Sequence, residues 1–336
     1  MTKYAAAPPS GQAFGDHAVP DEVFTPLSVT ATARIAEDIH RFDLAHPDGA
    51  PLPPFTAGAH VKLRTPNGLV RRYSLCSDPA ERGAWSIAVK REAGGAGGSL
   101  SLCDGVRAGD KLPCTAPRND FPLIGRPVSR ILIAGGIGIT PILSMIHAME
   151  AEGGPPWKLY YLTRSPAHTA FREELRAQGS KVVIHHDGGD PDRLLDLWPV
   201  LDQPKGRHVM CCGPRGLMQA VRDMTGHWPA SAVHFEDFGG AATTRAEDTP
   251  FRIRLARSGR EVAVPAGVTM LEALRQAGHA LPFSCESGTC GTCRAGLVAG
   301  AADHRDLVLM EHEKARAIMP CVSRAAPGTD ELVLDL

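Results

Sequence analysis

The chain has 336 residues, of which 43% are hydrophobic and 22% are charged, as in typical soluble globular proteins. Its net charge of -1 gives no general attraction to nucleic acid or anionic lipid. The length predicts two or three domains. The longest apolar run is too short for a membrane helix, and the N-terminus lacks the pattern of a secretory signal. We therefore expect a cytoplasmic protein without a membrane or nucleic-acid partner.

The first part of the chain divides into a tail and a β-rich domain. Residues 1–24 are rich in Ala, Pro and Gly and are predicted to form a flexible tail. Residues 25–126 contain short alternating segments between Pro and Gly turns, namely LSVTATARIA, HRFDLAH, AHVKLRT, RRYSLCS, WSIAVKR and GDKLPCT. Many short strands with such turns predict an antiparallel β-barrel.

The pattern changes in residues 127–238. A buried strand, RILIAGG, is followed by a predicted helix with Thr140 as N-cap and Pro141 as its first residue. The strands KLYYLT, KVVIHH, RHVMCC and AVHFE then alternate with the helical segments FREELRAQ and PRGLMQAVRDM. This alternation predicts a parallel α/β nucleotide-binding domain. Residues 239–250 read as a linker before a third domain, residues 251–336.

Four cysteines of the third domain have a ligand spacing. Cys285, Cys290 and Cys293 form C-x4-C-x2-C, and Cys321 follows at the end of a predicted helical segment. Four thiolates match a [2Fe-2S] cluster, with two on each iron. Zinc remains an alternative, although structural zinc sites favour two compact pairs; unliganded buried cysteines are the other. A helix buried through one face is expected before this loop, with the apolar residues Met270, Leu271 and Leu274.

The spacing of these cysteines resembles that of plant-type ferredoxins, which implies a C-terminal β-grasp ferredoxin domain. Earlier in the chain, Arg71, Arg72, Tyr73 and Ser74 combine guanidinium groups for a phosphate, a ring for a flat heterocycle and a hydroxyl for a polar ring atom. A charged surface strand is the alternative. The tetrapeptide resembles the R-x-Y-S motif of ferredoxin-NADP reductase-like flavoproteins, which implies that the arginine binds the flavin phosphate and that the tyrosine and serine hold the isoalloxazine.

A glycine-rich segment follows this motif. The order RRYSLCSDP, IAVKRE and GGSLS resembles the phthalate dioxygenase reductase branch, whose members use FMN in place of FAD. A flexible hairpin is the alternative interpretation of the glycines. The resemblance implies further flavin contacts, and the candidates are Ala88, Val89, Lys90, Gly97, Gly98 and Ser99.

A second glycine-rich turn lies between the buried strand and the helix of the middle domain. A pyrophosphate fits a turn of this kind at a helix N-terminus, and the form GGxGxTP resembles the NAD(P)-binding lobe of the same superfamily. The candidate residues of this turn are Gly135, Gly136, Gly138, Thr140 and Pro141.

The C-G-P segment, Cys212, Gly213 and Pro214, belongs to the same resemblance, which implies that Cys212 lies beside the nicotinamide C4. Simple packing is the alternative role for this cysteine. Phe238 would by resemblance cover the flavin ring where the nicotinamide must stack, and would have to move.

The preference between dinucleotides depends on Thr163 and Arg164, at the end of the second strand. Arg164 could favour the 2'-phosphate of NADP, and no carboxylate stands there to bind an NAD ribose. The resembled branch is nevertheless NADH-linked, so we expect NADH, with NADPH the less favoured donor. His185 and His186 are expected to be strand-end residues without a metal.

The three sites together predict an electron-transfer chain. A flavin can accept a hydride and release single electrons, which connects NADH to a one-electron cluster. The resemblance implies an NADH-dependent reductase for a separate Rieske non-haem iron oxygenase, acting on an aromatic or related acid by ring hydroxylation or O-demethylation. We expect the chain to be a monomer. The alternative is a reductase for a cytochrome P450 or other monooxygenase, because the acceptor surface cannot be read from one sequence.

Overall fold

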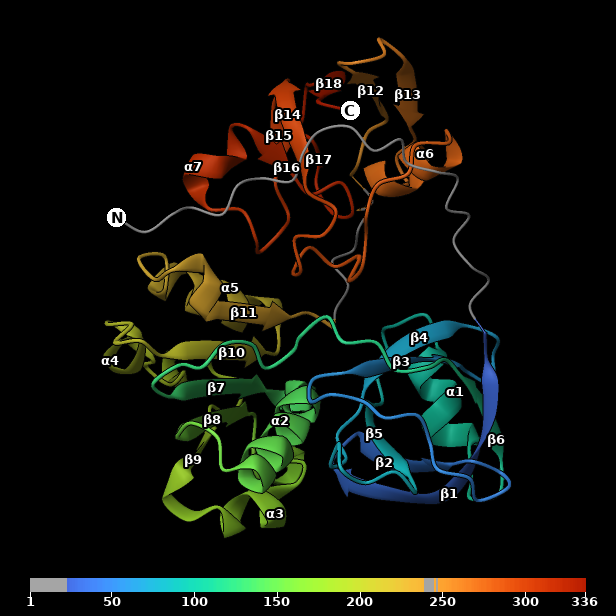
Figure 1. The fold of residues 1–336 in the computed structure, drawn as a ribbon, viewed down its shortest axis with the longest axis vertical. Helices are drawn as coiled ribbons and strands as arrows, with labels where there is room; N and C mark the ends of the chain where they lie inside the picture. The colour runs from blue at the N-terminus through green and yellow to red at the C-terminus, as the bar shows by residue number, and fades with distance from the viewer. Residues whose placement is uncertain (1–22, 239–244, 246) are drawn as a thin grey trace.

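The computed structural model describes residues 23–238, 245 and 247–336, which form three successive sheet-containing units (Figure 1). An antiparallel barrel, a parallel α/β unit and a ferredoxin-like unit confirm the predicted fold class. The predicted tail, residues 1–24, lies outside the described residues except for its last two. The predicted linker is described only at residues 245 and 247–250.

The first unit is a six-stranded antiparallel sheet with the order β4-β3-β6-β1-β2-β5. The bridge between Leu75 and Ile87 joins its two ends and closes the barrel. Apolar side chains alternate inward, and Val61, Leu63 and Trp85 are almost completely buried. The elements are β1 (Thr25–Ala36), β2 (Ile39–Ala45), β3 (His60–Arg64), β4 (Val70–Ser74), β5 (Trp85–Lys90), α1 (Gly98–Gly105) and β6 (Lys111–Cys114).

The second unit is a five-stranded parallel sheet with the order β11-β10-β7-β8-β9. Strand β7 lies in its centre and is completely buried, as its apolar sequence predicts. The elements are β7 (Arg130–Gly135), α2 (Ile139–Glu152), β8 (Trp157–Thr163), α3 (Arg172–Ala177), β9 (Val182–His186), α4 (Trp198–Leu201), β10 (His208–Cys212), α5 (Arg215–Met224) and β11 (Val233–Glu236). Short 3-10 turns are η1 (Gly136–Gly138), η2 (Pro166–His168), η3 (Gly179–Lys181), η4 (Pro191–Arg193) and η5 (Ala230–Ala232).

The start of helix α2 differs from the expectation. The 3-10 turn Gly136–Gly138 leads directly into α2, whose N-cap is Gly138, so the prediction of Thr140 as N-cap was wrong. The Thr140 hydroxyl instead donates to the Ile137 carbonyl at 3.1 Å. Pro141 is therefore the third helical residue, where its missing N–H is still one that the helix leaves unpaired.

The third unit is a mixed sheet with the order β13-β12-β18-β14-β16, covered by α6, and a separate β15-β17 pair. The predicted apolar face of α6 is buried. The elements are β12 (Phe251–Leu255), β13 (Glu261–Val264), α6 (Met270–Gln276), β14 (Ala295–Ala299), β15 (Ala302–Asp303), α7 (Glu311–Lys314), β16 (Ala317–Ile318), β17 (Arg324–Ala325) and β18 (Glu331–Leu334). Cys321 lies in a turn after β16 and not at the end of a helix, because α7 stops at Lys314.

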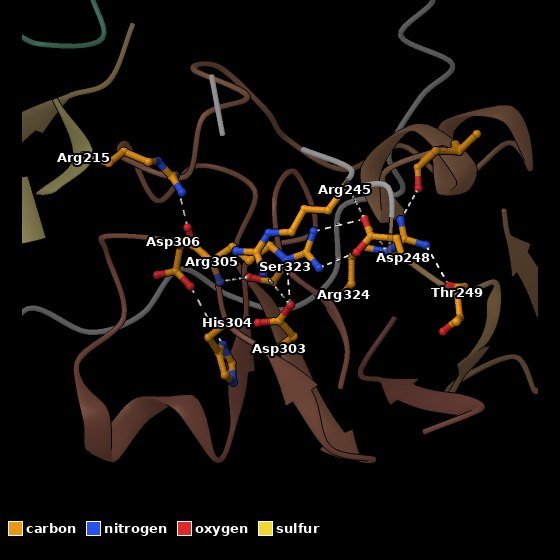
Figure 2. Close-up of polar contacts among 11 residues, drawn as sticks. Arg215, Arg245, Asp248, Thr249, Asp303, His304, Arg305, Asp306, Ser323 and Arg324 are labelled. Carbon is orange, nitrogen blue, oxygen red and sulfur yellow. Dashed lines mark hydrogen bonds and ion pairs between the residues drawn. The ribbon is translucent and has the colours of Figure 1, made fainter. Parts of the chain in front are cut away.

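The three units contact one another through two kinds of interface. The barrel and the parallel unit share one apolar core, in which Ala57 and Phe121 pack with Ile139, Ile142 and Met145. The third unit lies across both (Figure 1). Arg215 of α5 donates to the Arg305 carbonyl of this unit (Figure 2), and Arg222 of α5 donates to the Asp306 carbonyl. Within the described ranges, no helix is both long and apolar enough to cross a bilayer.

Candidate functional site

Strand β4 presents the predicted flavin motif in two directions. Successive side chains of a strand point to opposite faces, so Arg71 and Tyr73 share one face and Arg72 and Ser74 the other. Arg71 lies against the start of α1, since a Cβ placed on Gly98 would be 3.3 Å from Arg71 Cγ. A guanidinium beside a helix N-terminus is suited to a phosphate. Burial raises the pKa of Tyr73 to about 12, which keeps its ring and hydroxyl neutral.

The glycine-rich segment forms the beginning of α1, a helix that the sequence analysis did not predict. Gly97 precedes the helix at φ 85°, a conformation that favours glycine. The Ser99 hydroxyl accepts a hydrogen bond from the Glu92 N–H at 3.0 Å, which closes the loop. Of the other candidates, Ala88 and Val89 are buried in β5 and Lys90 pairs with Glu92 at 2.9 Å. Gly97, Gly98 and Ser99, at the start of α1, are therefore the candidates of this set that fit a flavin phosphate.

Ser74 joins the barrel to a carboxylate that the sequence analysis missed. The Ser74 hydroxyl donates to Glu236 Oε2 at 3.2 Å, across the junction with the parallel unit. Burial raises the pKa of Glu236 to about 8, and the hydrogen bond from Ser74 opposes this rise. The sequence signal that could have identified Glu236 is its position at the end of β11, two residues before Phe238.

The two nucleotide motifs meet at the carboxyl ends of β7 and β10. These strands are neighbours at the point where the strand order reverses, which is where open α/β sheets bind ligands. A Cβ on Gly138 would lie 2.2 Å from the Cys212 carbonyl oxygen, and one on Gly135 would lie 2.6 Å from Pro214 Cδ. Gly135 and Gly138 are therefore required for the close approach of the two turns, whereas Gly136 has open space around it and a φ of 53°. Gly213 lies in the same contact.

Cys212 is completely buried in this structure, and burial raises the pKa of its thiol well above the usual range. Phe238 follows β11 and is 39% exposed. The Cys212 thiol therefore has no open path to a nicotinamide in this arrangement, and its predicted position beside the ring requires neighbouring groups to move.

At the end of β8, the Thr163 hydroxyl bonds to the Thr169 hydroxyl and to His186 Nδ1, at 2.9 and 2.8 Å. The Thr163 hydroxyl is thus already occupied by hydrogen bonds within the protein. Arg164 is exposed at the same strand end. His185 Nε2 lies 2.7 Å from the Arg193 carbonyl, so both histidines have structural partners, as expected of strand-end residues.

The four predicted cluster cysteines form two pairs. Cys285 hydrogen-bonds to Cys290, and Cys293 to Cys321. The bond from Cys290, together with others from Ser287 and Thr289, lowers the pKa of Cys285 to about 3, despite the opposing effect of burial.

The hydrogen bond with Cys321 likewise lowers the pKa of Cys293. No group of three or more His, Cys, Asp or Glu side chains in the described ranges surrounds a single metal position. Two pairs of cysteine thiols fit a two-iron cluster with two protein ligands on each iron.

Arg72 points to the cluster loop and not to the start of α1. Its guanidinium donates to the carbonyl of Cys285 and, at 3.1 Å, to that of Ser284. It also lies 3.3 Å from Glu286 Oε1. The Ser284 hydroxyl donates to the Asp120 carboxylate, a second bond between the barrel and this loop. The loop that contains Cys285, the first predicted cluster ligand, is therefore hydrogen-bonded to the strand that carries the flavin motif.

Comparisons with known proteins agree with this architecture. A family model described as "Oxidoreductase FAD-binding domain" matches residues 26–122, and one described as "2Fe-2S iron-sulfur cluster binding domain" matches residues 253–326. Phthalate dioxygenase reductase from Burkholderia cepacia is 52% identical over 94% of this chain and 98% of its own. A phthalate 4,5-dioxygenase reductase subunit from Pseudomonas putida is 53% identical with the same coverage.

A solved structure of phthalate dioxygenase reductase, described as a modular structure for electron transfer from pyridine nucleotides to [2Fe-2S], matches with a TM-score of 0.67. It is 52% identical and covers 93% of this chain and 98% of its own. The domains thus establish an oxidoreductase with a flavin, a pyridine nucleotide and a [2Fe-2S] cluster. Because both identity and coverage are high along the chain, the resemblance seen in the sequence is confirmed, and the chain belongs to the phthalate dioxygenase reductase family.

Proposed function

We propose that the chain transfers electrons from NADH, through FMN and the [2Fe-2S] cluster, to a separate Rieske non-haem iron oxygenase that acts on an aromatic or related acid. The observation that carries this proposal is the junction of the three units. Ser74 of the barrel bonds to Glu236 of the parallel unit, and the adjacent Arg72 bonds to the loop of Cys285. Because Glu236 is paired with Cys212 in the parallel sheet, residues proposed for the flavin, nucleotide and cluster sites meet at this junction.

The residues of the chain act by positioning, because hydride transfer needs no protein acid or base. A bound flavin would supply the exchange between a two-electron hydride and single electrons. Arg71 and the α1 terminus would hold its phosphate, and Tyr73 and Ser74 would contact its ring. Glu236 holds a proton at neutral pH, since its pKa is about 8. Cys285, Cys290, Cys293 and Cys321 would bind the cluster.

FMN is the proposed flavin because the segments in β4, β5 and α1 follow the order found in the resembled branch. NADH is the proposed donor on the same ground, although the exposed Arg164 leaves room for the 2'-phosphate of NADPH. We propose a monomer in the cytoplasm, with ring hydroxylation or O-demethylation occurring on the oxygenase partner. Relatives are named as reductase subunits of oxygenase systems, which supports a separate partner protein.

An anaerobic titration with NADH tests the electron path, with the flavin followed by absorbance and the cluster by low-temperature EPR. We expect flavin bleaching together with a reduced [2Fe-2S] signal; bleaching without a cluster signal would refute the path. The acceptor is tested with the oxygenase component of a phthalate dioxygenase system, with phthalate and O2. Coupled consumption of NADH and phthalate supports a Rieske oxygenase partner.

A cytochrome P450 is the comparison acceptor. The solved structure of a type IV self-sufficient P450 monooxygenase contains a similar region, 34% identical over 93% of this chain and 41% of its own, with a TM-score of 0.68. Electron delivery to a P450, without delivery to the Rieske oxygenase, would overturn the proposed partner.

A further inference from the structure

We propose that Arg72 is a positioning residue for electron transfer from the flavin to the cluster, because it fixes the cluster loop on the flavin-binding strand. This inference rests on the proposed function and adds a role for a side chain that the R-x-Y-S resemblance leaves unassigned. In the sequence, Arg72 lies between Arg71, proposed to bind the flavin phosphate, and Tyr73, proposed to contact the ring. Its guanidinium nevertheless contacts another domain.

The direction of the side chain follows from the strand itself. Arg71 and Arg72 are consecutive in β4, so they point to opposite faces. Arg71 lies at the α1 terminus, whereas Arg72 contacts Ser284, Cys285 and Glu286. One short strand therefore contacts both redox sites, and the two arginines have different tasks.

The contacts of Arg72 suit a fixed position more than simple charge attraction. Two of its acceptors are consecutive backbone carbonyls, so the planar guanidinium fixes the course of the chain at the first proposed cluster ligand. The ion pair with Glu286 is secondary, because its side chains are 30% and 41% exposed. Asp120 holds the same loop through the Ser284 hydroxyl, from a different segment of the barrel.

Two consequences follow from this arrangement. Electron transfer slows steeply as donor and acceptor separate, so release of the loop should slow cluster reduction while hydride transfer continues. A positive charge close to the cluster also favours its more negative reduced form. Loss of the Arg72 charge should therefore make the midpoint potential of the cluster more negative.

The test uses the holoprotein with the variants Arg72→Met and Arg72→Lys. Anaerobic stopped flow with one equivalent of NADH separates flavin reduction from cluster reduction. We expect unchanged flavin reduction and a loss of tenfold or more in the rate of cluster reduction for Arg72→Met, with partial recovery in Arg72→Lys. Amide hydrogen exchange of residues 284–289 should rise in Arg72→Met, and the potential of its cluster should fall.

Arg41→Met is the matched control, because Arg41 bonds to Asp43 and Ser86 within its own sheet. An unchanged rate of cluster reduction in Arg72→Met, or an equal loss in the control, overturns the inference. If Arg72→Met does not retain its cluster, Arg72→Lys decides, since slower cluster reduction supports the role and a wild-type rate refutes it. Failure of wild-type protein to reduce its own cluster would instead overturn the proposed electron path.

Discussion

A buried ion cluster attaches the end of the linker to the ferredoxin domain, and we expect its loss to unfold this domain selectively. Asp248 accepts hydrogen bonds from Arg305 at 2.6 and 3.1 Å and pairs with Arg324 at 3.4 Å (Figure 2). The side chains of Asp248, Arg305 and Arg324 are only 3%, 4% and 2% exposed. The change Asp248→Asn preserves the shape of the side chain, removes the carboxylate that pairs with the buried Arg324, and leaves Arg305 with Asp303 as its remaining counter-charge.

Removal of one member of a buried ion pair typically costs about 3–5 kcal/mol. We expect a loss of this size in the free energy of unfolding of the ferredoxin domain, or a decrease of about 1–5 M in the urea midpoint. The assay is urea unfolding followed by the visible circular dichroism of the cluster. Asp335→Asn is the control, because its pair with Arg257 is exposed and contributes about 0–1 kcal/mol.

The pH dependence gives an independent check. The hydrogen bond from Arg305 is the largest cause of the lowered pKa of Asp248, relative to its usual value of 3.8. A lowered carboxyl pKa stabilises the folded state above about pH 4, and this contribution disappears as the pH falls through the folded-state pKa. The difference between wild type and Asp248→Asn should therefore shrink in acid. Equal effects of Asp248→Asn and Asp335→Asn at neutral pH would refute the reasoning.

Three further changes test other parts of the site. Cys321→Ser should remove the cluster EPR signal while NADH still bleaches the flavin, and equal loss of both would contradict the division of roles. Gly138→Ala should reduce NADH-driven flavin reduction at least tenfold in stopped flow, since its Cβ would lie 2.2 Å from a backbone oxygen; Gly216→Ala, with open space around it, should not. Glu236 has a pKa raised to about 8, so its stabilising contribution is lost as pH rises from about 4.5 to 8. Glu236→Gln should gain about 2–3 kcal/mol in unfolding free energy over wild type between about pH 5.5 and 7.5, and a constant difference would refute the assignment.

The strand pattern of the barrel and of the parallel sheet could be predicted because each strand buries its own alternating or continuous apolar side chains. Helix α1 could not, because glycine has low helix propensity and the segment around Gly98 is stabilised by contacts outside its own sequence. The start of α2 was misplaced because Gly136, at φ 53°, begins a turn upstream of the expected cap.

The residues of the functional site could be predicted from the sequence only in part, for a related reason. The cysteine spacing was visible in the sequence, but the burial of Glu236 depends on three units meeting, which no local pattern records. The direction of Arg72 could have been inferred, since its side chain points to the face of β4 opposite to that of Arg71. Its partners at residues 284–286 lie far away along the chain, so they required the structure.

The two interfaces of the ferredoxin domain differ in kind from the one between the flavin and nucleotide domains. The latter is an apolar core around Phe121 and Met145, and its separation would expose that core to water. The ferredoxin domain is held mainly through arginine hydrogen bonds to carbonyls, including those from Arg72, Arg215 and Arg222. Water can replace such bonds at little net cost. Because a one-electron carrier must also reach an external acceptor, we expect any separation of the units during electron delivery to occur at the interface of the ferredoxin domain.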